Sequence, residues 1–161
     1  MKTSIDQLSC STLRRDRALL GIGHRWPGAS ERVALGIMST STFQSEFDAW
    51  LDVALSQPAA PSVVAFCFNL AEPWCIEIVG SDRYSADDPD WPCEESFRPD
   101  VEQLTLPESE LGETWEVVLG AAKLLVTAYL NRPSAGSAIL RRAEAVAVGF
   151  VDGELHRVWP R

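Results

Sequence analysis

Five carboxylates lie within nine positions of this chain, around one tryptophan and beside two prolines. The segment reads Asp87-Asp88-Pro89-Asp90-Trp91-Pro92-Cys93-Glu94-Glu95. Carboxylates at this density can bind Ca²⁺, act as a pair in glycoside hydrolysis, or attract a basic partner. Because prolines disfavour a regular helix or a central strand, we expect an exposed loop that carries the candidate functional residues.

Calcium binding and hydrolysis are the weaker interpretations of this loop. The spacing of Asp87, Asp88 and Asp90 differs from the Asp-x-Asp-x-Asp-Gly pattern of an EF-hand. Pro89 and Pro92 also stiffen the backbone. A hydrolase needs two carboxyl groups about 5 to 10 Å apart, which depends on the fold. We therefore predict no catalytic residue, metal or cofactor, and keep a metal- or carboxylate-dependent hydrolase as the alternative.

Binding of another protein is the function that the loop favours. Tryptophan is enriched at the centres of interfaces, and surrounding carboxylates select basic partners and speed their encounter. Trp91 would be the anchor, and the selecting side chains would be Asp87, Asp88, Asp90, Glu94 and Glu95. Two alternatives stay open: a solvated loop whose Trp91 ring packs against the edge of the core, and a structural accessory protein without a defined pocket.

Composition and charge bound the class of protein. The chain has 161 residues, 46% hydrophobic and 23% charged, which suits one globular domain with a real core. Its net charge of −9 disfavours nucleic acids and anionic membranes. The longest apolar runs, such as Val117 to Val126 with Lys123 inside, are shorter than the roughly 20 residues of a membrane span. We expect a cytoplasmic protein.

The four cysteines do not form a metal motif. Cys10, Cys67, Cys75 and Cys93 are far apart in the sequence, and the chain has only two histidines. Zinc sites normally show paired cysteines at short spacing. A domain of this size can also bury enough core without disulfides, so we expect mostly reduced, intracellular thiols.

The charge changes sign near Met38. Residues 1–37 hold six basic and three acidic side chains, whereas residues 38–161 hold eight basic and 20 acidic ones. The first segment lacks sustained periodicity, so we expect it to be poorly ordered, and residues 38–161 to form one acidic domain. A basic tail, a transit-like presequence and a start codon placed too far upstream are three open explanations for it.

A helix and a hairpin are predicted next. Ser41 and Gln44 have the spacing of a capping box, and apolar residues recur at helical intervals from Phe43 to Leu55, opposite a solvated face with Glu46, Asp48 and Asp52. Residues 63–70 and 74–80 alternate like the two strands of a hairpin. Placing Leu70 opposite Trp74 gathers the large apolar side chains on one face, with no disulfide between Cys67 and Cys75.

The second half repeats this order after a long acidic connection at residues 81–111. A helix is expected at 112–131, apolar nearly all round and therefore the most buried element. A short helix at 134–142 and a second hairpin follow, with a type I′ turn at Asp152-Gly153. The order α-β-β-α-β-β predicts an α+β two-layer domain, with two main helices on a mostly antiparallel, four-stranded sheet.

Part of the chain resembles a family of small uncharacterised bacterial proteins, in which a Trp-x-Ile-Glu strand precedes an acidic Asp-x-Asp-Trp-x-Cys-x-Glu segment. The matching residues are Phe68-Asn69-Leu70, Trp74, Ile76-Glu77, Val79-Gly80, Asp87 through Glu95 and Phe97, with Pro92 where a small residue such as alanine is expected. No biochemical role comes with this resemblance. The acidic α+β character is also similar to immunity proteins of bacterial toxin systems, which implies a non-enzymatic protein and a basic toxin domain as its partner.

Overall fold

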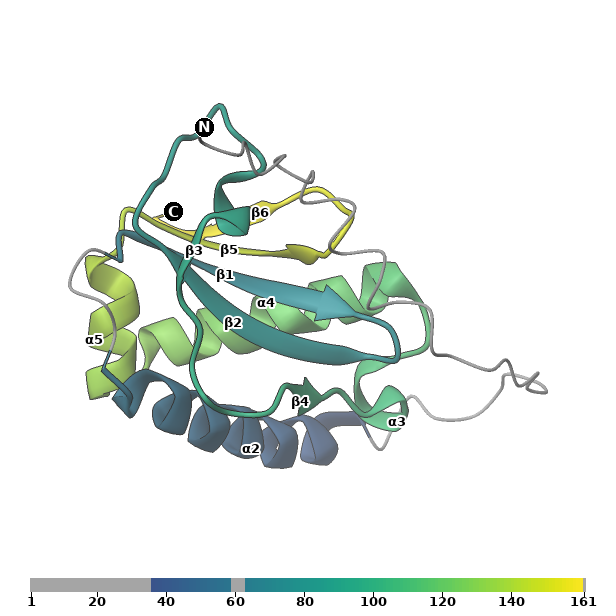
Figure 1. Ribbon diagram of the computed structural model, residues 1–161. Helices are drawn as coiled ribbons and strands as arrows, with labels where there is room; N and C mark the ends of the chain where they lie inside the picture. Colours follow the sequence, from purple (N-terminus) through teal and green to yellow (C-terminus); the bar gives the residue numbers. More distant parts are fainter. Residues whose placement is uncertain (1–35, 59–62, 161) are drawn as a thin grey trace, which may run out of the picture.

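The computed structural model describes residues 36–58 and 63–160 (Figure 1). The prediction of a poorly ordered basic segment therefore falls almost entirely outside the described residues. The helices are α2 (Gly36–Ser56), α3 (Glu108–Leu111), α4 (Trp115–Asn131) and α5 (Ala135–Arg142), with a 3₁₀ turn η1 (Trp91–Cys93). The strands are β1 (Ala65–Ala71), β2 (Cys75–Ser81), β3 (Glu95–Phe97), β4 (Leu104–Thr105), β5 (Ala145–Phe150) and β6 (His156–Trp159).

The elements confirm an α+β fold, but the sheet is mixed and has six strands. Its order is β3-β2-β1-β5-β6, with β4 also paired to β2. The two hairpins meet along β1 and β5, which run parallel, with Ala65 opposite Ala145. The predicted four-stranded antiparallel sheet is therefore wrong at its centre. Parallel neighbours need a long crossover connection, which usually contains a helix. Here the chain passes through α4 and α5 before it enters β5, and β5 then runs in the same direction as β1.

The first hairpin has a register two residues away from the predicted one. Leu70 lies opposite Ile76 and Phe68 opposite Ile78, whereas Leu70 was expected opposite Trp74. A shift of two residues leaves every side chain on the same face, because side chains alternate with a period of two. The pattern of apolar residues therefore predicted the faces correctly and could not distinguish the two registers.

The second hairpin does not contain the predicted two-residue turn at Asp152-Gly153. The Gly153 N–H donates instead to the Phe150 carbonyl at 2.9 Å, and His156 is the first β6 residue to pair, opposite Val148. The wider loop folds closely over Gly149, where an added Cβ would lie 2.7 Å from the Glu154 carbonyl oxygen.

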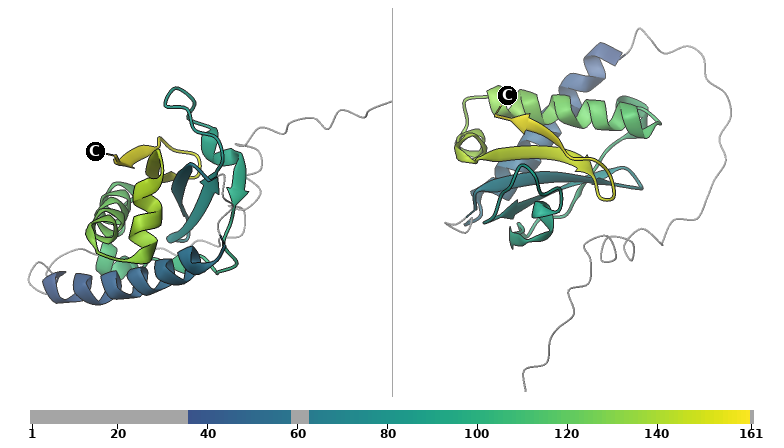
Figure 2. Two further views of the ribbon diagram at one scale, coloured as in Figure 1. Left: turned by 90° about the vertical axis from the view of Figure 1, so that its left-hand side faces the viewer. Right: turned by 90° about the horizontal axis from the view of Figure 1, so that it is seen from above.

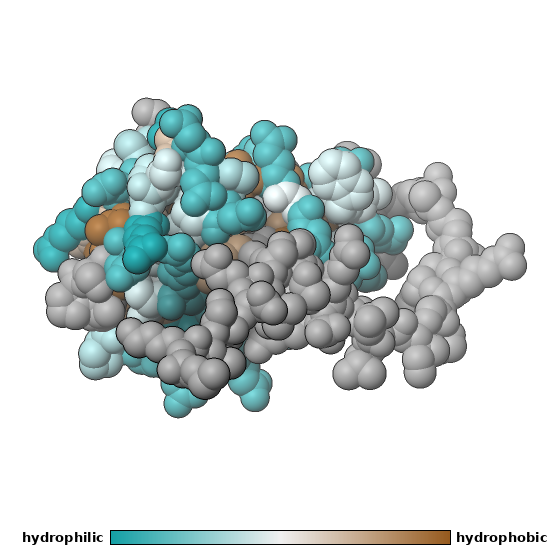
Figure 3. Space-filling view, turned by 45° about the horizontal axis from the view of Figure 1, so that its top comes forward, coloured by the Kyte–Doolittle hydropathy of each residue, from teal (hydrophilic) through white to brown (hydrophobic). Residues whose placement is uncertain are grey.

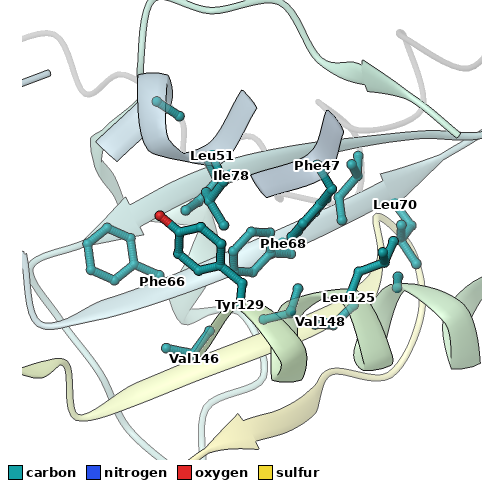
Figure 4. Close-up of a cluster of buried hydrophobic side chains, with 14 of the residues drawn as sticks. Phe47, Leu51, Phe66, Phe68, Leu70, Ile78, Leu125, Tyr129, Val146 and Val148 are labelled. Carbon is teal, nitrogen blue, oxygen red and sulfur yellow. The ribbon is translucent and has the colours of Figure 1, made fainter. Parts of the chain in front are cut away.

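Three helices, α2, α4 and α5, cover one face of the sheet (Figure 2). Between these helices and the sheet lies a core in which large side chains from the helices meet alternate strand residues (Figure 4). Phe43, Phe47, Leu51 and Leu55 of α2 are buried, as their helical spacing predicts. However, α2 begins at Gly36, so Ser41 is not at its N-terminus as the capping box implied.

The last two helices agree with their predicted positions but not with every predicted property. Ser134 caps α5 and exchanges hydrogen bonds with Ser137 in a capping box. Helix α4 is not buried all round, since Val117 is 52% and Leu124 73% exposed. No helix in the described part of the chain is long and apolar enough to cross a membrane.

The predicted solvated face of α2 is wrong for two of its three acids, because these two bind a neighbouring arginine. Arg132, directly after α4, pairs with Asp48 at 2.8 Å and also with Asp52. The Tyr129 hydroxyl donates to the same Asp52 carboxylate at 2.6 Å. Glu46 is exposed, as expected. The polar contacts of Asp48 and Asp52 hold α2 against the end of α4.

Candidate functional site

The connection after β2 crosses the face of the sheet that the helices leave open, and Trp91 holds it there. The Trp91 side chain is only 5% exposed. Its ring stands edge-on to Tyr84, with the ring centroids 5.6 Å apart. Beneath it, strand residues with small side chains leave room for an indole: Ala65, Cys67, Val79, Ala145 and Ala147.

This burial corrects the prediction that Trp91 is an exposed anchor. A side chain that is 5% exposed has almost no surface left for a partner. The competing interpretation, in which the ring packs against the edge of the core, describes what the structure shows. Trp91 therefore supports the loop from within, because large aromatic side chains contribute most to packing when they are enclosed.

Three carboxylates of the loop, those of Asp87, Asp88 and Asp90, are exposed and close together in sequence. We call them the acidic tip. The Asp88 carboxylate accepts the Asp90 N–H at 2.9 Å, and the Asp88 N–H donates to the Ser85 carbonyl at 3.3 Å. Such local bonds order a turn. Within the described residues, no basic side chain pairs with any of the three.

The other two predicted selecting residues, Glu94 and Glu95, are already paired. Glu94 lies 3.1 Å from Arg83, in a pair whose side chains are 51% and 75% exposed. Glu95 accepts the Nε–H of Arg98 at 2.9 Å. Their negative charge is thus partly neutralised within the protein. The structure separates the predicted set into three unpaired aspartates and two paired glutamates.

A polar cluster lies beside the loop, on the same open face of the sheet. Arg98 bridges Glu95 to Glu77, whose carboxylate it meets at 2.8 Å. Asn69, opposite Glu77 in the β1–β2 register, donates to Glu77 at 3.4 Å and is itself buried. The Cys67 thiol donates to Asn69 at 3.3 Å. This cluster joins both hairpin strands to residues 95–98 of the long connection.

The roles of Arg98 and Asn69 were not predicted from the sequence. The alternation of β1 and β2 does place Asn69 and Glu77 on the reverse face, but the predicted register put Asn69 opposite Cys75. Arg98 is separated from Glu77 by 21 positions. Its hydrogen bond with Glu95, and the nearby charge of Glu77, raise the pKa of the Arg98 guanidinium, so it is a permanent cation of this face.

Cys75, next to this polar cluster, is poorly suited to act as a nucleophile. Burial, and then the charge of Glu77, raise the pKa of Cys75 above its ordinary value of 9.0. The thiol therefore stays protonated at neutral pH, and a thiolate is the reactive form. As expected, no disulfide joins Cys75 to Cys67. Cys93 departs from the expectation of mostly reduced thiols, because it is disulfide-bonded.

The acidic tip and the polar cluster border one broad hollow of about 2300 Å³. Its described lining includes Asn69, Glu77 and Arg98, together with Asp88 and Asp90. The same hollow also reaches Trp50 of α2 and Gly120 and Lys123 of α4, so it is an open region of the surface and not an enclosed pocket. Hydrophilic side chains cover most of the described surface on this side (Figure 3). No group of three His, Cys, Asp or Glu in the described ranges could hold a metal ion.

Comparison with known proteins adds no relative to this picture. No family model, no curated protein and no solved structure matches the chain. The resemblance of residues 68–97 to a bacterial family stays a prediction.

Proposed function

We propose that this protein binds a basic protein partner through the acidic tip, without carrying out a reaction. The observation behind the proposal is that Asp87, Asp88 and Asp90 stay exposed and unpaired among the described residues, on a loop whose base is held by the buried Trp91. A rigid array of charges loses little conformational entropy on binding. It also attracts an oppositely charged partner and speeds the encounter.

The proposed interface differs from the predicted one in its contact residues. The three aspartates provide the attraction, and Glu94, half-exposed at the edge of the loop, extends the negative surface. Trp91 has no contact role. As the class of partner we propose a basic toxin domain, which would make this chain an immunity protein. The acidic surface supports this choice, since a partner of like charge would be repelled.

The hydrolase alternative has no specific observation in its favour. The Glu77 carboxylate is engaged by Arg98 and Asn69, which suits a structural role more than proton transfer. The large open hollow also differs from a pocket that excludes water around a substrate.

The test is affinity capture with the full chain, followed by reversal of the tip charges. The variant D87K/D88K/D90K should lose partner affinity on the order of a hundredfold, because attraction becomes repulsion. Its thermal stability should stay close to that of the wild type, since the three side chains are exposed.

A matched control carries the same change in net charge elsewhere on the surface. Glu46, Glu108 and Glu144 are exposed and lie outside the loop and the hollow, so E46K/E108K/E144K should keep most of the affinity. Capture that survives reversal of the tip, or that falls equally in the control, would rule out the acidic tip as the interface.

A further inference from the structure

The outward side of α4 carries an apolar strip that is exposed among the residues the structure describes. Val117 is 52% and Leu124 73% exposed, and Gly120 and Ala128 are exposed between and beyond them. Residues three, four and seven positions apart share one face of a helix. Together with the half-buried Ala121, these residues form what we call the α4 strip.

Gly120, at the middle of the strip, points to a contact from outside. It lies in the interior of a 17-residue helix, where glycine is less favourable than alanine by roughly 1 kcal/mol. A Cβ added to Gly120 would meet no atom within 4 Å. The residues that the structure describes therefore leave room for a side chain at this position. A second backbone that packs closely against this position would supply one.

Two opposite charges flank the strip on the same side. Glu116 and Lys123 are seven residues apart, which is about two turns and 10 Å along the helix. Neither makes an ion pair within the described part of the chain. On a protein with a net charge of −9, this strip is locally balanced, with one acid and one base beside its apolar residues.

We propose that the α4 strip is the contact between two copies of this chain, with their α4 helices antiparallel about a two-fold axis near Gly120 and Ala121. In that arrangement Val117 faces Leu124 of the partner subunit, and the reverse contact repeats it, as a two-fold interface requires. Glu116 then lies beside Lys123 of the partner subunit, so two ion pairs form. The central glycines let the backbones approach each other.

A second copy fits the strip better than the basic partner proposed above. A basic protein is steered to the acidic tip, and Lys123 would repel it at the strip. Two copies of an acidic chain repel each other over most of their surface. A charge-balanced strip that is complementary to itself is a place where they can meet.

The experiment is sedimentation of the full chain at high concentration. We expect a mass close to twice the 17.7 kDa of one chain. Leu124→Glu should give a monomer, because it buries two new charges in the contact. Val53→Glu is the matched control: Val53 is 55% exposed on α2, and this variant should remain dimeric. Circular dichroism would verify that both variants fold.

Charge exchange tests the antiparallel arrangement itself. Glu116→Lys or Lys123→Glu alone should weaken the dimer about tenfold or more, because each change places like charges side by side. The double variant E116K/K123E should recover the wild-type dissociation constant. A monomeric wild type, a dimer that survives Leu124→Glu, or a double variant no better than the single ones would overturn the proposal.

Discussion

The hydroxyl of Tyr129 on α4 donates a hydrogen bond to the Asp52 carboxylate on α2 at 2.6 Å, which joins two helices across 77 positions of the sequence. Arg132 stacks over the Tyr129 ring, 5.1 Å from its centroid, and pairs with the same aspartate. An apolar helix layer thus contains a directional contact, beside the Asp48–Arg132 ion pair and the hydrogen bond from Gln44 to the Leu125 carbonyl. These contacts specify how α2 lies on α4, because hydrogen bonds depend on orientation and burial of apolar area does not.

Removing the Tyr129 hydroxyl should lower the free energy of unfolding by an amount that depends on pH. Burial and the Asp52 carboxylate raise the pKa of Tyr129 above its ordinary value of 10.0. The folded protein therefore holds the phenol proton more tightly than the unfolded chain. This contribution to stability is complete below pH 10.0 and declines as the pH rises toward the raised pKa.

We therefore expect Tyr129→Phe to lose about 1 kcal/mol of unfolding free energy at neutral pH, and progressively less above pH 10.0. Urea unfolding of both proteins over this range measures the difference. The effect of Cys75, whose pKa is also raised, is common to both and cancels. A constant difference at all pH values would contradict the assignment.

Gly136→Ala should disturb the same contact from the side of α5. A Cβ at this position would lie 2.0 Å from the Tyr129 hydroxyl oxygen, so the ring must move away from Asp52. We expect a loss of about 1 to 3 kcal/mol. The loss should be smaller in the Tyr129→Phe background, since the clashing atom is gone, and a double-mutant cycle measures this coupling.

Trp91→Ala should lower the free energy of unfolding. Truncating an enclosed tryptophan costs about 3 to 5 kcal/mol, which thermal or urea unfolding would detect. Trp91→Phe should lose less, because it keeps a ring against the small residues of the sheet. The charge-reversal variant of the acidic tip should melt near the wild-type temperature. If Trp91→Ala were as stable as the wild type, the ring would not be part of the core.

Arg98 and Arg83, the two arginines of the loop region, should differ in their contributions to the free energy of unfolding. Arg98 meets Glu77 at 2.8 Å, and the Glu77 side chain is 22% exposed. Arg98→Ala should cost about 1 kcal/mol, because it leaves this carboxylate without its cation. Arg83 and Glu94 are 75% and 51% exposed, so Arg83→Ala should change stability by less than about 0.5 kcal/mol.

Chemical unfolding of the two alanine variants tests this order. Adding Glu77→Gln to Arg98→Ala should recover part of the loss, because a neutral amide does not need a cation. An equal cost for both arginines would contradict the difference in burial between the two ion pairs.

The local parts of the fold follow from the order of residues alone. Alternation placed Phe66, Phe68 and Leu70 on one face of β1, and helical spacing placed Phe47 and Leu51 inside. Both properties depend on neighbours a few positions apart. The hairpin register did not follow, because a shift by two residues preserves the faces. The parallel pairing of β1 with β5 depends on where α4 and α5 return the chain.

The properties of the candidate site also divide into those that the sequence determines and those that depend on the tertiary structure. Its density of carboxylates, and the prolines that keep it out of helices and strands, are properties of residues 87–95 themselves. Whether Trp91 faces solvent is decided by Ala65, Cys67 and Ala145, small residues of strands up to 54 positions from it, which together leave space for an indole. Only folding brings these strands side by side and sets Arg83 beside Glu94 and Arg98 beside Glu77. Burial and ion pairing depend on distances in space, which sequence spacing does not contain.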